Sequence, residues 1–484
     1  MKQDQLPEDK ILLKNMSNTL RKIKKEENYK NYLNDFKKCE GNSKKEWSIA
    51  KSHLFDSKNS HIERILDNNK MVIGSKAVAN SFNRFFITKV RNIRNSLDNQ
   101  HEDPMISYKR FIKTPENELN FESISMSELR KVFNKMKKSN SSAKDNISMK
   151  TISKIKESTL PLILRLINQV NSTGIFQESI KISRIVPIRK SFKESALKMS
   201  NHRPVNILSP ISKLIEKFWS IRILEHLNKY NMIDPNHQGG YPGRQSTTSI
   251  IDIHQRLSFI RKNRKHGALI GLDQSGAYDV VPHCILAEKL KHIGLSEHSV
   301  KTISNYLKNR KQFVRINSND SKILLTGPVS VGQGSVISGL LYGIMTLDMH
   351  YQLHLKSHKN NYEYSRCNGP YIGTFIDDCF GLLETEDADM LWIKINEFIM
   401  GMNSYYTNNR LKNNIKKSSI MIISDNINLK DREILINGNI LKHSSTMRVL
   451  GTLLSDNLKW NSYICEGKNS LLSQLKKEYQ QSNI

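Results

Sequence analysis

Two adjacent carboxylates lie in an apolar setting that points to chemistry. Asp377 and Asp378 stand inside the stretch 371–383, which reads YIGTFIDDCFGLL. The β-branched and aromatic residues on both sides predict two buried strands, with Asp378-Cys379 as the tight turn between them. Because a buried acid without a partner costs several kcal/mol, a pair at the tip of an apolar hairpin indicates a bound cation. A plain Asp-containing turn is the alternative for this stretch taken alone.

A third carboxylate, Asp273, ends the apolar run 268–272 far upstream in the sequence. If that strand is a neighbour of the hairpin, three carboxylates meet at one edge of a sheet. Oxygen ligands suit Mg²⁺, which takes one or two carboxylates, waters and substrate phosphates. Two such ions, with Mn²⁺ as a possible substitute, stabilise the attacking and leaving oxygens of an in-line displacement. A nucleotidyl transfer needs this arrangement and little covalent help from the protein.

The elements that must position these acids are strands interleaved with helices, which indicates an α+β fold. Apart from the hairpin, the periodicities predict strands at 185–188, 268–272, 312–316, 419–423, 434–440 and 447–453. They predict helices at 77–90, 127–138, 160–170, 211–227, 247–260, 284–293, 336–347 and 387–402. Residues 1 to about 100 are highly charged and predicted helical, and the segment from about 100 to 130 is predicted to be a linker.

The charge balance restricts the partners. Lys and Arg number 75 against 46 Asp and Glu, giving a formal net charge of +29. Such an excess favours a polyanionic partner, nucleic acid above all, over a merely solubilising surface. The basic residues are spread along the chain, which predicts a lined groove rather than a basic tail.

The compartment is restricted by cysteine use and by the absence of leader signals. The 5 cysteines are odd in number and widely spaced, which indicates a reducing compartment and neither a disulfide framework nor a zinc knuckle. The first residues carry no apolar signal-peptide core, so we expect an intracellular protein, nuclear or cytoplasmic, that is not secreted. The uncharged stretch 323–347 is interrupted by Gly327-Pro328 and by the polar residues 332–335. A loop and a buried helix are therefore expected there, and no membrane span.

Seven stretches in order make the chain resemble a reverse transcriptase (RNA-directed DNA polymerase) of the non-LTR, LINE-like retrotransposon class. The resemblance covers roughly 121–464. The matching stretches are Lys190 with 201–205 (NHRPV), 238–248 (QGGYPGRQSTT), 272–281 (LDQSGAYDVV), 331–338 (VGQGSVIS), 375–378 (FIDD), 411–418 (LKNNIKKS) and 449–460 (VLGTLLSDNLKW). Each stretch alone is weak, and it is their common order that carries the resemblance.

The resemblance implies roles for matching positions around the metals. Asp273 and Asp377 would bind the two ions directly, and Asp378 would support the second. Tyr278, five residues after Asp273, would be the steric gate under the sugar. Asp279 is expected to be a structural acid, such as a helix cap, rather than a ligand.

Further roles implied by the resemblance concern the nucleotide. Gln333 would line the ribose, and Lys190 and Arg203 would hold the triphosphate, since such cations pair well with phosphate oxygens. Lys417 would protonate the leaving pyrophosphate. For Lys190 and Lys417, solvated surface lysines are an equal alternative.

The sequence departs from the family pattern at four positions. Phe375 and Ile376 stand where Tyr and Ala are common, and Gly332 and Gly339 stand where Pro is common. No departure removes a metal ligand, yet together they leave open a catalytically decayed, nucleic-acid-binding relic of the same fold. An RNA-dependent RNA polymerase is a further alternative. The intact acids count against the relic, and the bulky Tyr278 counts against the RNA polymerase.

The implied architecture is the right-hand polymerase fold, with fingers and palm. We expect a helical basic extension and linker at 1–120, fingers at 121–265, palm at 266–455 and a truncated thumb start at 456–484, so that the thumb is short or absent. The implied partners are an RNA template, a DNA primer or target, and dNTPs, with no membrane. Such elements often encode an upstream endonuclease, so the chain is expected to be a piece of a longer polyprotein or a truncated element.

Overall fold

The computed structural model describes most of the chain from residue 62 onward. The described ranges are 62–97, 101–191, 195–355, 371–436, 439–461 and 463–465, with Thr19, Glu26, Glu27, Asn34 and Cys39 as isolated positions. The helices expected before residue 62 and the expected thumb start beyond 465 lie outside these ranges. Within them, no helix is long and apolar enough to cross a membrane.

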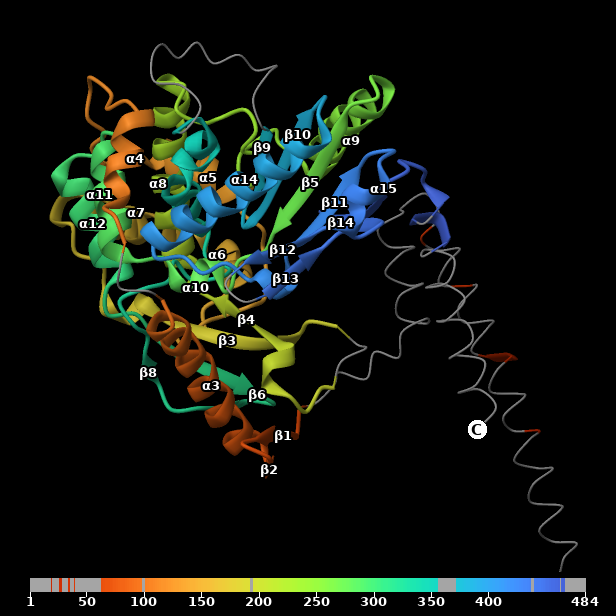
Figure 1. Cartoon of the computed structure of the whole chain (residues 1–484). Helices are drawn as coiled ribbons and strands as arrows, with labels where there is room; N and C mark the ends of the chain where they lie inside the picture. Colours follow the sequence, from red (N-terminus) through yellow and green to blue (C-terminus); the bar gives the residue numbers. More distant parts are fainter. Residues whose placement is uncertain are drawn as a thin grey trace, which may run out of the picture. The chain divides into compact units, whose positions relative to one another are not determined.

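A four-stranded antiparallel sheet carries the segments that contain the three carboxylates, and we refer to it as the palm sheet (Figure 1). Its strands, in spatial order, are β11 (Ser419–Ile423), β5 (His266–Leu272), β10 (Asp378–Thr385) and β9 (Tyr371–Phe375). Strand β10 pairs with β5 so that Cys379 lies opposite Leu272. This register brings Asp378 and Asp273, the next residues along each strand, to the same edge.

Both faces of the palm sheet are covered, which explains why its strands are nearly continuous apolar runs. On one face, α14 (Ala388–Asn408) packs against Ala268 and Ile270 of β5. Its Phe398 lies against Gly381, where a Cβ would come within 2.2 Å of the ring. On the other face lie α9 (Ser246–Lys262) and the hairpin of β14 (Thr446–Val449) and β15 (Thr452–Ser455).

A second sheet, the fingers sheet, is built around a parallel pair of strands. Its order is β4 (His202–Ile207), β3 (Ile182–Arg189), β6 (Lys311–Ile316) and β7 (Asn319–Asp320), with β8 (Leu324–Leu325) also paired to β6. Helix α3 (Ser75–Asn95) packs on this sheet through Phe82 and Phe86. Its buried Asn83 donates to the backbone oxygens of Gln312 and Lys322, which ties the helix to β6.

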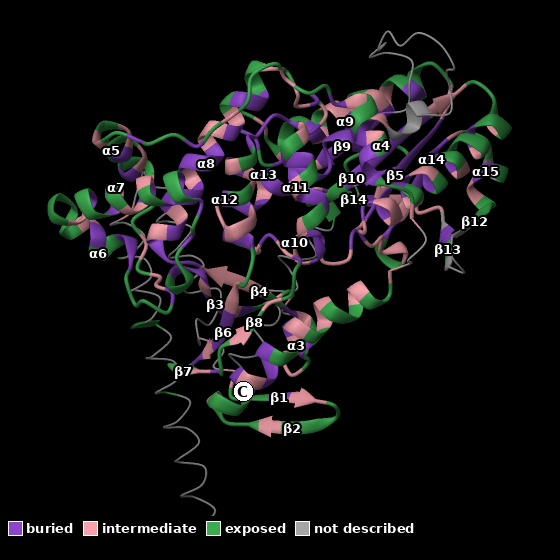
Figure 2. Ribbon diagram, turned by 90° about the vertical axis from the view of Figure 1, so that its left-hand side faces the viewer, coloured by how far each residue is buried: buried purple, intermediate pink, exposed green. Residues whose placement is uncertain are grey.

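The largest core lies within a layer of helices, and Figure 2 shows buried stretches both on these helices and on the palm sheet. Trp219 stacks on Phe121 with ring centroids 5.4 Å apart. The helices of this layer are α4 (Pro104–Phe111), α5 (Met126–Lys135), α6 (Met149–Lys154), α7 (Lys156–Thr173), α8 (Pro210–Lys229), α11 (His283–His292), α12 (Glu297–Leu307) and α13 (Ser338–Met345). The remaining elements are β1 (Arg64–Asp67), β2 (Lys70–Ile73), α10 (Ala277–Val280), α15 (Ile427–Asp431), β12 (Glu433–Ile436), β13 (Asn439–Lys442) and 3-10 turns, among them Leu347–Leu355 and Ile415–Lys417.

Several element predictions before residue 130 and near the C-terminus were wrong in detail. A hairpin, β1–β2, occupies 64–73, where a helix was expected, and its turn uses Asn68 and Asn69 at positive φ. The predicted linker contains α4, which begins with Asp103 accepting from Met105 N and Pro104 in the first turn. The strands predicted at 434–440 and 447–453 are each two short strands of a hairpin.

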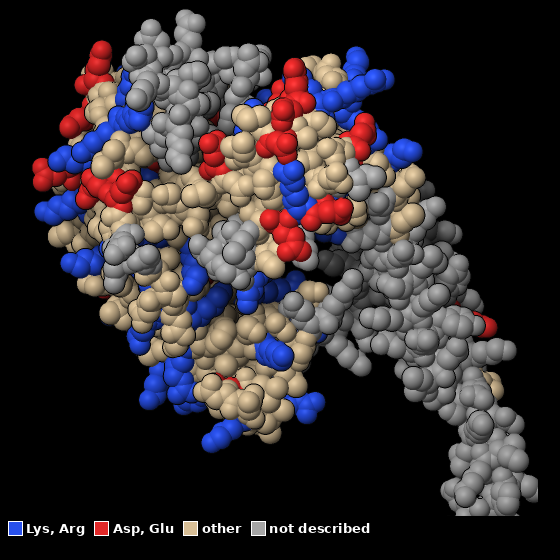
Figure 3. Space-filling model, viewed as in Figure 1, with Lys and Arg blue, Asp and Glu red and all other residues tan. Residues whose placement is uncertain are grey.

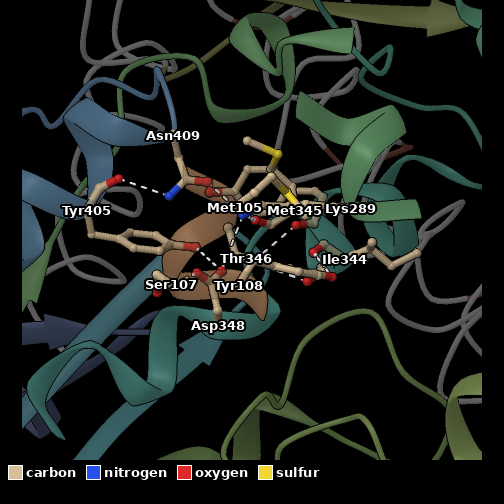
Figure 4. A network of polar contacts seen from close by, with 12 residues as sticks. Met105, Ser107, Tyr108, Lys289, Ile344, Met345, Thr346, Asp348, Tyr405 and Asn409 are labelled. Atoms are coloured by element: carbon tan, nitrogen blue, oxygen red, sulfur yellow. Dashed lines mark hydrogen bonds and ion pairs between the residues drawn. The ribbon is translucent and has the colours of Figure 1, made fainter. Parts of the chain in front are cut away.

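A fully buried ion pair joins the helical layer to the palm. Lys289 Nζ of α11 lies 3.2 Å from Asp348 Oδ1, and both side chains are 0% exposed. Figure 4 shows the groups around the pair. The ammonium also donates to Asn409 Oδ1 and to Met345 O, each at 2.6 Å. The cation therefore has three acceptors and no hydrogen left without a partner.

The carboxylate of the pair is satisfied by elements far apart in the chain. Asp348 accepts from Tyr405 of α14 at 2.9 Å and from Ser107 of α4 at 3.0 Å. Because burial of a charge is tolerated only with such complete hydrogen bonding, this network fixes α4 against α14. The segment expected to be a linker thus contributes directly to the core beneath the palm.

Replacing Lys289 with Ala is expected to lower the free energy of unfolding by about 3 to 5 kcal/mol, because it leaves Asp348 buried without its cation. Denaturant titration of the two proteins measures this difference. Lys291→Ala, on the exposed side of the same helix, serves as the matched control and is expected to stay within about 0.5 kcal/mol of the parent. Equal stability of the Lys289 variant and the parent would show that the pair contributes nothing.

Candidate active site

The catalytic candidates lie at the turn between β9 and β10. The turn consists of Ile376 and Asp377, and Asp378 is already the first residue of β10. The predicted turn at Asp378-Cys379 was therefore placed two residues too late. Ile376 has φ 60, a left-handed conformation that is costly for a β-branched residue and must be held by its surroundings.

Asp273, directly after β5, is oriented by the segment that follows α14. Asn414 Nδ2 donates to Asp273 Oδ2 at 2.7 Å, and the Asn414 backbone N–H donates to Asp273 O at 2.8 Å. Lys417 Nζ lies 4.0 Å from the same carboxylate oxygen, and its side chain is 66% exposed. One oxygen of Asp273 is thus fixed by an amide, and Lys417 stands at the site rather than on a remote surface.

The three carboxylates influence one another electrostatically. Loss of water around Asp378, followed by the charges of Asp377 and Asp273, raises the pKa of Asp378 to about 6. Desolvation and Asp273 also raise the pKa of Asp377, whereas Arg203 acts to lower it. Although solvent reaches both side chains of the pair, the crowding of protein and like charge disfavours their ionised forms. A bound cation would relieve this repulsion.

The donor set fits magnesium rather than a metal that needs a closed cage. Across the described ranges, no group of three or more His, Cys, Asp or Glu side chains is close enough to enclose an ion. Magnesium needs only one or two carboxylates, because it keeps waters and takes phosphate oxygens from the substrate. Asp273 and Asp377, which influence each other electrostatically at the end of the β5–β10 pair, supply that number of carboxylates.

A loop before α13 is held against β4 by Asn206. The carbonyl oxygen of Gln333 accepts from Asn206 N and Asn206 Nδ2 of β4, both at 2.9 Å. Gly334 allows the close approach, because a Cβ there would lie 2.8 Å from Asn206 O. Gly332 has φ +71, a value that proline cannot adopt. The observed backbone therefore excludes the proline that is common in the family at this position and favours glycine.

The same loop rests on a buried acid that the sequence did not single out. Glu216 of α8 is 0% exposed and accepts from Ser335 Oγ and Val336 N, each at 2.7 Å. Its other oxygen accepts from Ser212 at 2.8 Å. An acid within the apolar helix predicted at 211–227 was the available signal, but such an acid is usually solvated. Here it positions the loop that carries Gln333.

Comparison with known proteins identifies the family. The family model described as "Reverse transcriptase (RNA-dependent DNA polymerase)" matches residues 188–454, more than half of the chain. The chain belongs to the reverse transcriptase family. This match confirms the resemblance to reverse transcriptases. The matched range includes Asp273, Asp377 and Asp378.

The individual relatives are polymerases of non-LTR mobile elements. A probable RNA-directed DNA polymerase from transposon BS of Drosophila melanogaster is 24% identical over 268 residues, 54% of this chain and 27% of the relative. The RNA-directed DNA polymerase from mobile element jockey of Drosophila funebris is 23% identical over 359 residues, 73% of this chain and 37% of the relative. The chain thus spans well under half the length of these relatives.

Among solved structures, a C-terminally truncated apo telomerase from Candida tropicalis matches with a TM-score of 0.38 and 13% identity, covering 59% of this chain and 55% of that one. The expected α+β class with palm and fingers is confirmed by family membership together with the two sheets described above. The residue boundaries assigned to the fingers and palm stay predictions.

Arg203 and Lys190, the two cations expected to hold the nucleotide triphosphate, lie in different surroundings. Arg203 is exposed on β4 and close enough to lower the pKa of Asp377. Lys190 Nζ donates to Ser200 O at 2.7 Å, and its backbone N–H donates to Asn201 O at 2.8 Å. The structure therefore brings Arg203 to the carboxylates and ties Lys190 to the loop before β4.

Tyr278, the expected gate, lies between the acids and α13. Its carbonyl oxygen accepts from Val331 N at 2.9 Å, and its ring lies 5.4 Å from that of Tyr342. A Cβ on Gly339 would be 3.8 Å from its hydroxyl. Burial, with Asp377 as the next contribution, raises the pKa of the phenol. The hydroxyl therefore stays protonated beside the metal-binding edge.

The neighbouring acid, Asp279, does not act as a helix cap. Helix α10 begins after Gly276, which makes no side-chain capping bond. Burial raises the pKa of Asp279, and Lys89 of α3 opposes that shift. Asp279 lines a separate cavity, described below, and its role as a structural acid stays a prediction.

The segment before α9 contacts the catalytic turn directly, and this contact was not predicted. Gln238 N donates to Thr374 O at 2.7 Å, and Thr374 N donates to Asn236 O at 3.1 Å, which adds a short backbone pairing to the edge of β9. At Gly239 a Cβ would lie 2.2 Å from Ile376 N. This segment therefore presses on the strained residue of the turn.

Proposed function

We propose that the chain is an RNA-directed DNA polymerase that extends a DNA primer 3′-hydroxyl on an RNA template with dNTPs. The observation that carries the proposal is the meeting of Asp273, Asp377 and Asp378 at one sheet edge in a member of the reverse transcriptase family. Asp273 and Asp377 would hold two Mg²⁺ ions, with Asp378 in support. The ions would stabilise charge on the attacking and leaving oxygens.

The other side chains of the site position the nucleotide and handle one proton. Arg203, exposed on β4 and close to Asp377, binds the triphosphate by charge-assisted hydrogen bonds, and Lys190 assists from the neighbouring loop. Gln333 lines the ribose, and Tyr278 is the steric gate under the sugar. Lys417, 4.0 Å from Asp273, donates a proton to the leaving pyrophosphate, as a positioned general acid does.

The surface suits a polyanionic partner such as an RNA–DNA hybrid. In Figure 3, the lower body, which carries α3 and the fingers sheet, shows many Lys and Arg side chains and few acids. This agrees with the formal net charge of +29. A hybrid held through its backbone needs such a surface, because A-form grooves offer side chains little direct access to the bases.

Primer extension on an RNA template with Mg²⁺ tests the proposal. A polymerase produces DNA from dNTPs, and the product length follows the template. Binding of the primed template without extension would favour the decayed relic. Extension with rNTPs in preference to dNTPs would favour the RNA polymerase.

Tyr278→Ala tests the sugar assignment. A phenol ring beside the metals fills the space that a 2′-hydroxyl needs, so its removal is expected to raise the ratio of rNTP to dNTP incorporation by about tenfold, which corresponds to about 1.4 kcal/mol. Both nucleotides are compared on one primed RNA template. Tyr342→Phe, which keeps the neighbouring ring, is the control. If the ring only packs, both activities fall together and the ratio is unchanged.

A further inference from the structure

A cavity of about 900 Å³ lies behind the proposed nucleotide site. Its walls come from α3, from β3 and β4, from α11 and from the loop 325–332. Pro204 and Asn206 of β4 line it, whereas Arg203, the residue before Pro204, is on the opposite face of the strand with the acids. Side chains alternate along a strand, so β4 separates two distinct sites.

The cavity is strongly cationic. Five of its lining residues are basic, and a single carboxylate, Asp279, accompanies them. The basic residues are Lys89, Arg91, Arg94, Lys308 and Arg310. Within the described part of the chain, none of these five forms an ion pair with a carboxylate. A cluster of five cations with one carboxylate among them favours an anion as ligand.

Two of these arginines have a buried donor nitrogen for which the described residues offer no acceptor. Arg94 Nη1 and Arg310 Nη2 have no hydrogen-bond partner among the described residues. Arg310 is fixed in place, since its other terminal nitrogen donates to Tyr306 O at 3.3 Å and its guanidinium lies 4.7 Å from the Tyr306 ring centroid. Burial, followed by the positive charge of Arg410, lowers the pKa of Arg94. An anion would satisfy both guanidinium groups.

The rest of the wall is apolar, which narrows the class of ligand. Phe86, Val90, Leu307 and Val329 line the cavity beside the cations. A bare phosphate would leave this apolar surface in contact with water. A ligand with one anionic group and one flat apolar body would cover it. A nucleotide, with its phosphate on guanidinium groups and its base on an apolar wall, has that composition.

We propose that this cavity is a second nucleotide-binding site, with Arg94 and Arg310 on the phosphate and the apolar wall on the base. The nucleotide is either free or one unit of an RNA strand. The site is independent of the transfer chemistry, so its occupancy can be measured without any polymerase activity. Asn206, which lines the cavity, also donates two hydrogen bonds to Gln333. A ligand in the cavity would therefore lie next to a residue that supports the catalytic loop.

Cys284 provides a direct reporter of occupancy. It lines the cavity and is exposed, as is Cys465, which lies outside the cavity. We expect AMP or a short RNA oligonucleotide to slow alkylation of Cys284 by at least fivefold and to leave the rate at Cys465 unchanged. Adenosine, which lacks the phosphate, is expected to protect much less than AMP. Protection by AMP identifies a free nucleotide as ligand, and protection by RNA alone identifies a strand.

Charge-neutral variants test the two arginines. Arg94→Gln and Arg310→Gln are each expected to weaken the protecting ligand by about tenfold or more, because each removes a charge-assisted bond to phosphate. Arg84→Gln, an exposed position on the same helix outside the cavity, is the matched control and is expected to bind normally. Thermal unfolding of all three variants checks that they fold. The proposal is overturned if neither probe protects Cys284, or if all three variants bind alike.

Discussion

Replacing Asp377 with Asn is expected to reduce primer extension by about 10³-fold or more while primed template is still bound. The substitution keeps the size of the side chain and removes one anionic ligand from the shared edge of β5 and β10. Metal clamping supplies several kcal/mol of transition-state stabilisation, and each 1.36 kcal/mol is a factor of ten in rate. Single-turnover extension with saturating dNTP measures the loss.

Asp431→Asn controls for the change of charge, because Asp431 is exposed on α15, which contributes no residue to the site described above. It is expected to extend primers at the parental rate. Template binding, measured by fluorescence anisotropy, is expected to be nearly equal for the two variants. If the Asp377 variant extends primers at the parental rate, the carboxylate pair is only part of a turn. The proposed function would then lose its basis.

Gly239→Ala is expected to lower extension by about 10²-fold although residue 239 touches no substrate. The added methyl group would meet Ile376 N at 2.2 Å and Phe375 C at 2.7 Å. Ordinary contacts begin near 3.4 Å, so the turn would move by about 1 Å, a misplacement that can cost about 10²-fold in rate. Because Asp377 follows Ile376, the movement is transmitted to a metal ligand.

The readout that separates positioning from loss of fold is the Mg²⁺ requirement. A displaced Asp377 is expected to raise the Mg²⁺ concentration for half-maximal extension, with thermal unfolding changed little. Gly401→Ala is the control, since a Cβ there meets nothing within 4 Å and lies inside α14. Alanine at that position is expected to add about 0.5 to 1 kcal/mol of stability. If the Mg²⁺ requirement of the Gly239 variant is unchanged, the contact between Gly239 and Ile376 does not position the metal ligand.

The strand that ends at Asp273 was predictable because its apolar run is long and stops at a charged residue. The hairpin was predictable as a hairpin, but its turn was not. Hairpin turns are recognised by residues such as Asn and Gly that accept positive φ, and here Ile376 adopts it. That conformation is held by the approach of Gly239, which is far away in sequence. No local pattern carries such information.

Buried polar residues were missed for a related reason. Glu216 and Lys289 stand in apolar helices, where a charged residue normally marks the solvated face. Their partners come from distant segments, so their burial is decided by tertiary contacts. Helix α4 was missed for a different reason. Asp103 followed by Pro104 is a regular helix start, but the surrounding polar segment favoured a linker.

The Lys289–Asp348 network also sets an order of events during synthesis. Ser107 leaves the ribosome early, whereas Asp348 and Asn409, which complete the same network, follow much later. At about 5 to 20 residues per second, the roughly 300 residues between Ser107 and Asn409 take about 15 to 60 s to be made. Helix α4 can pack on α11 and α13 before then, because its apolar residues share their core. The buried polar network that ties α4 to α14 is completed only at the end of that interval.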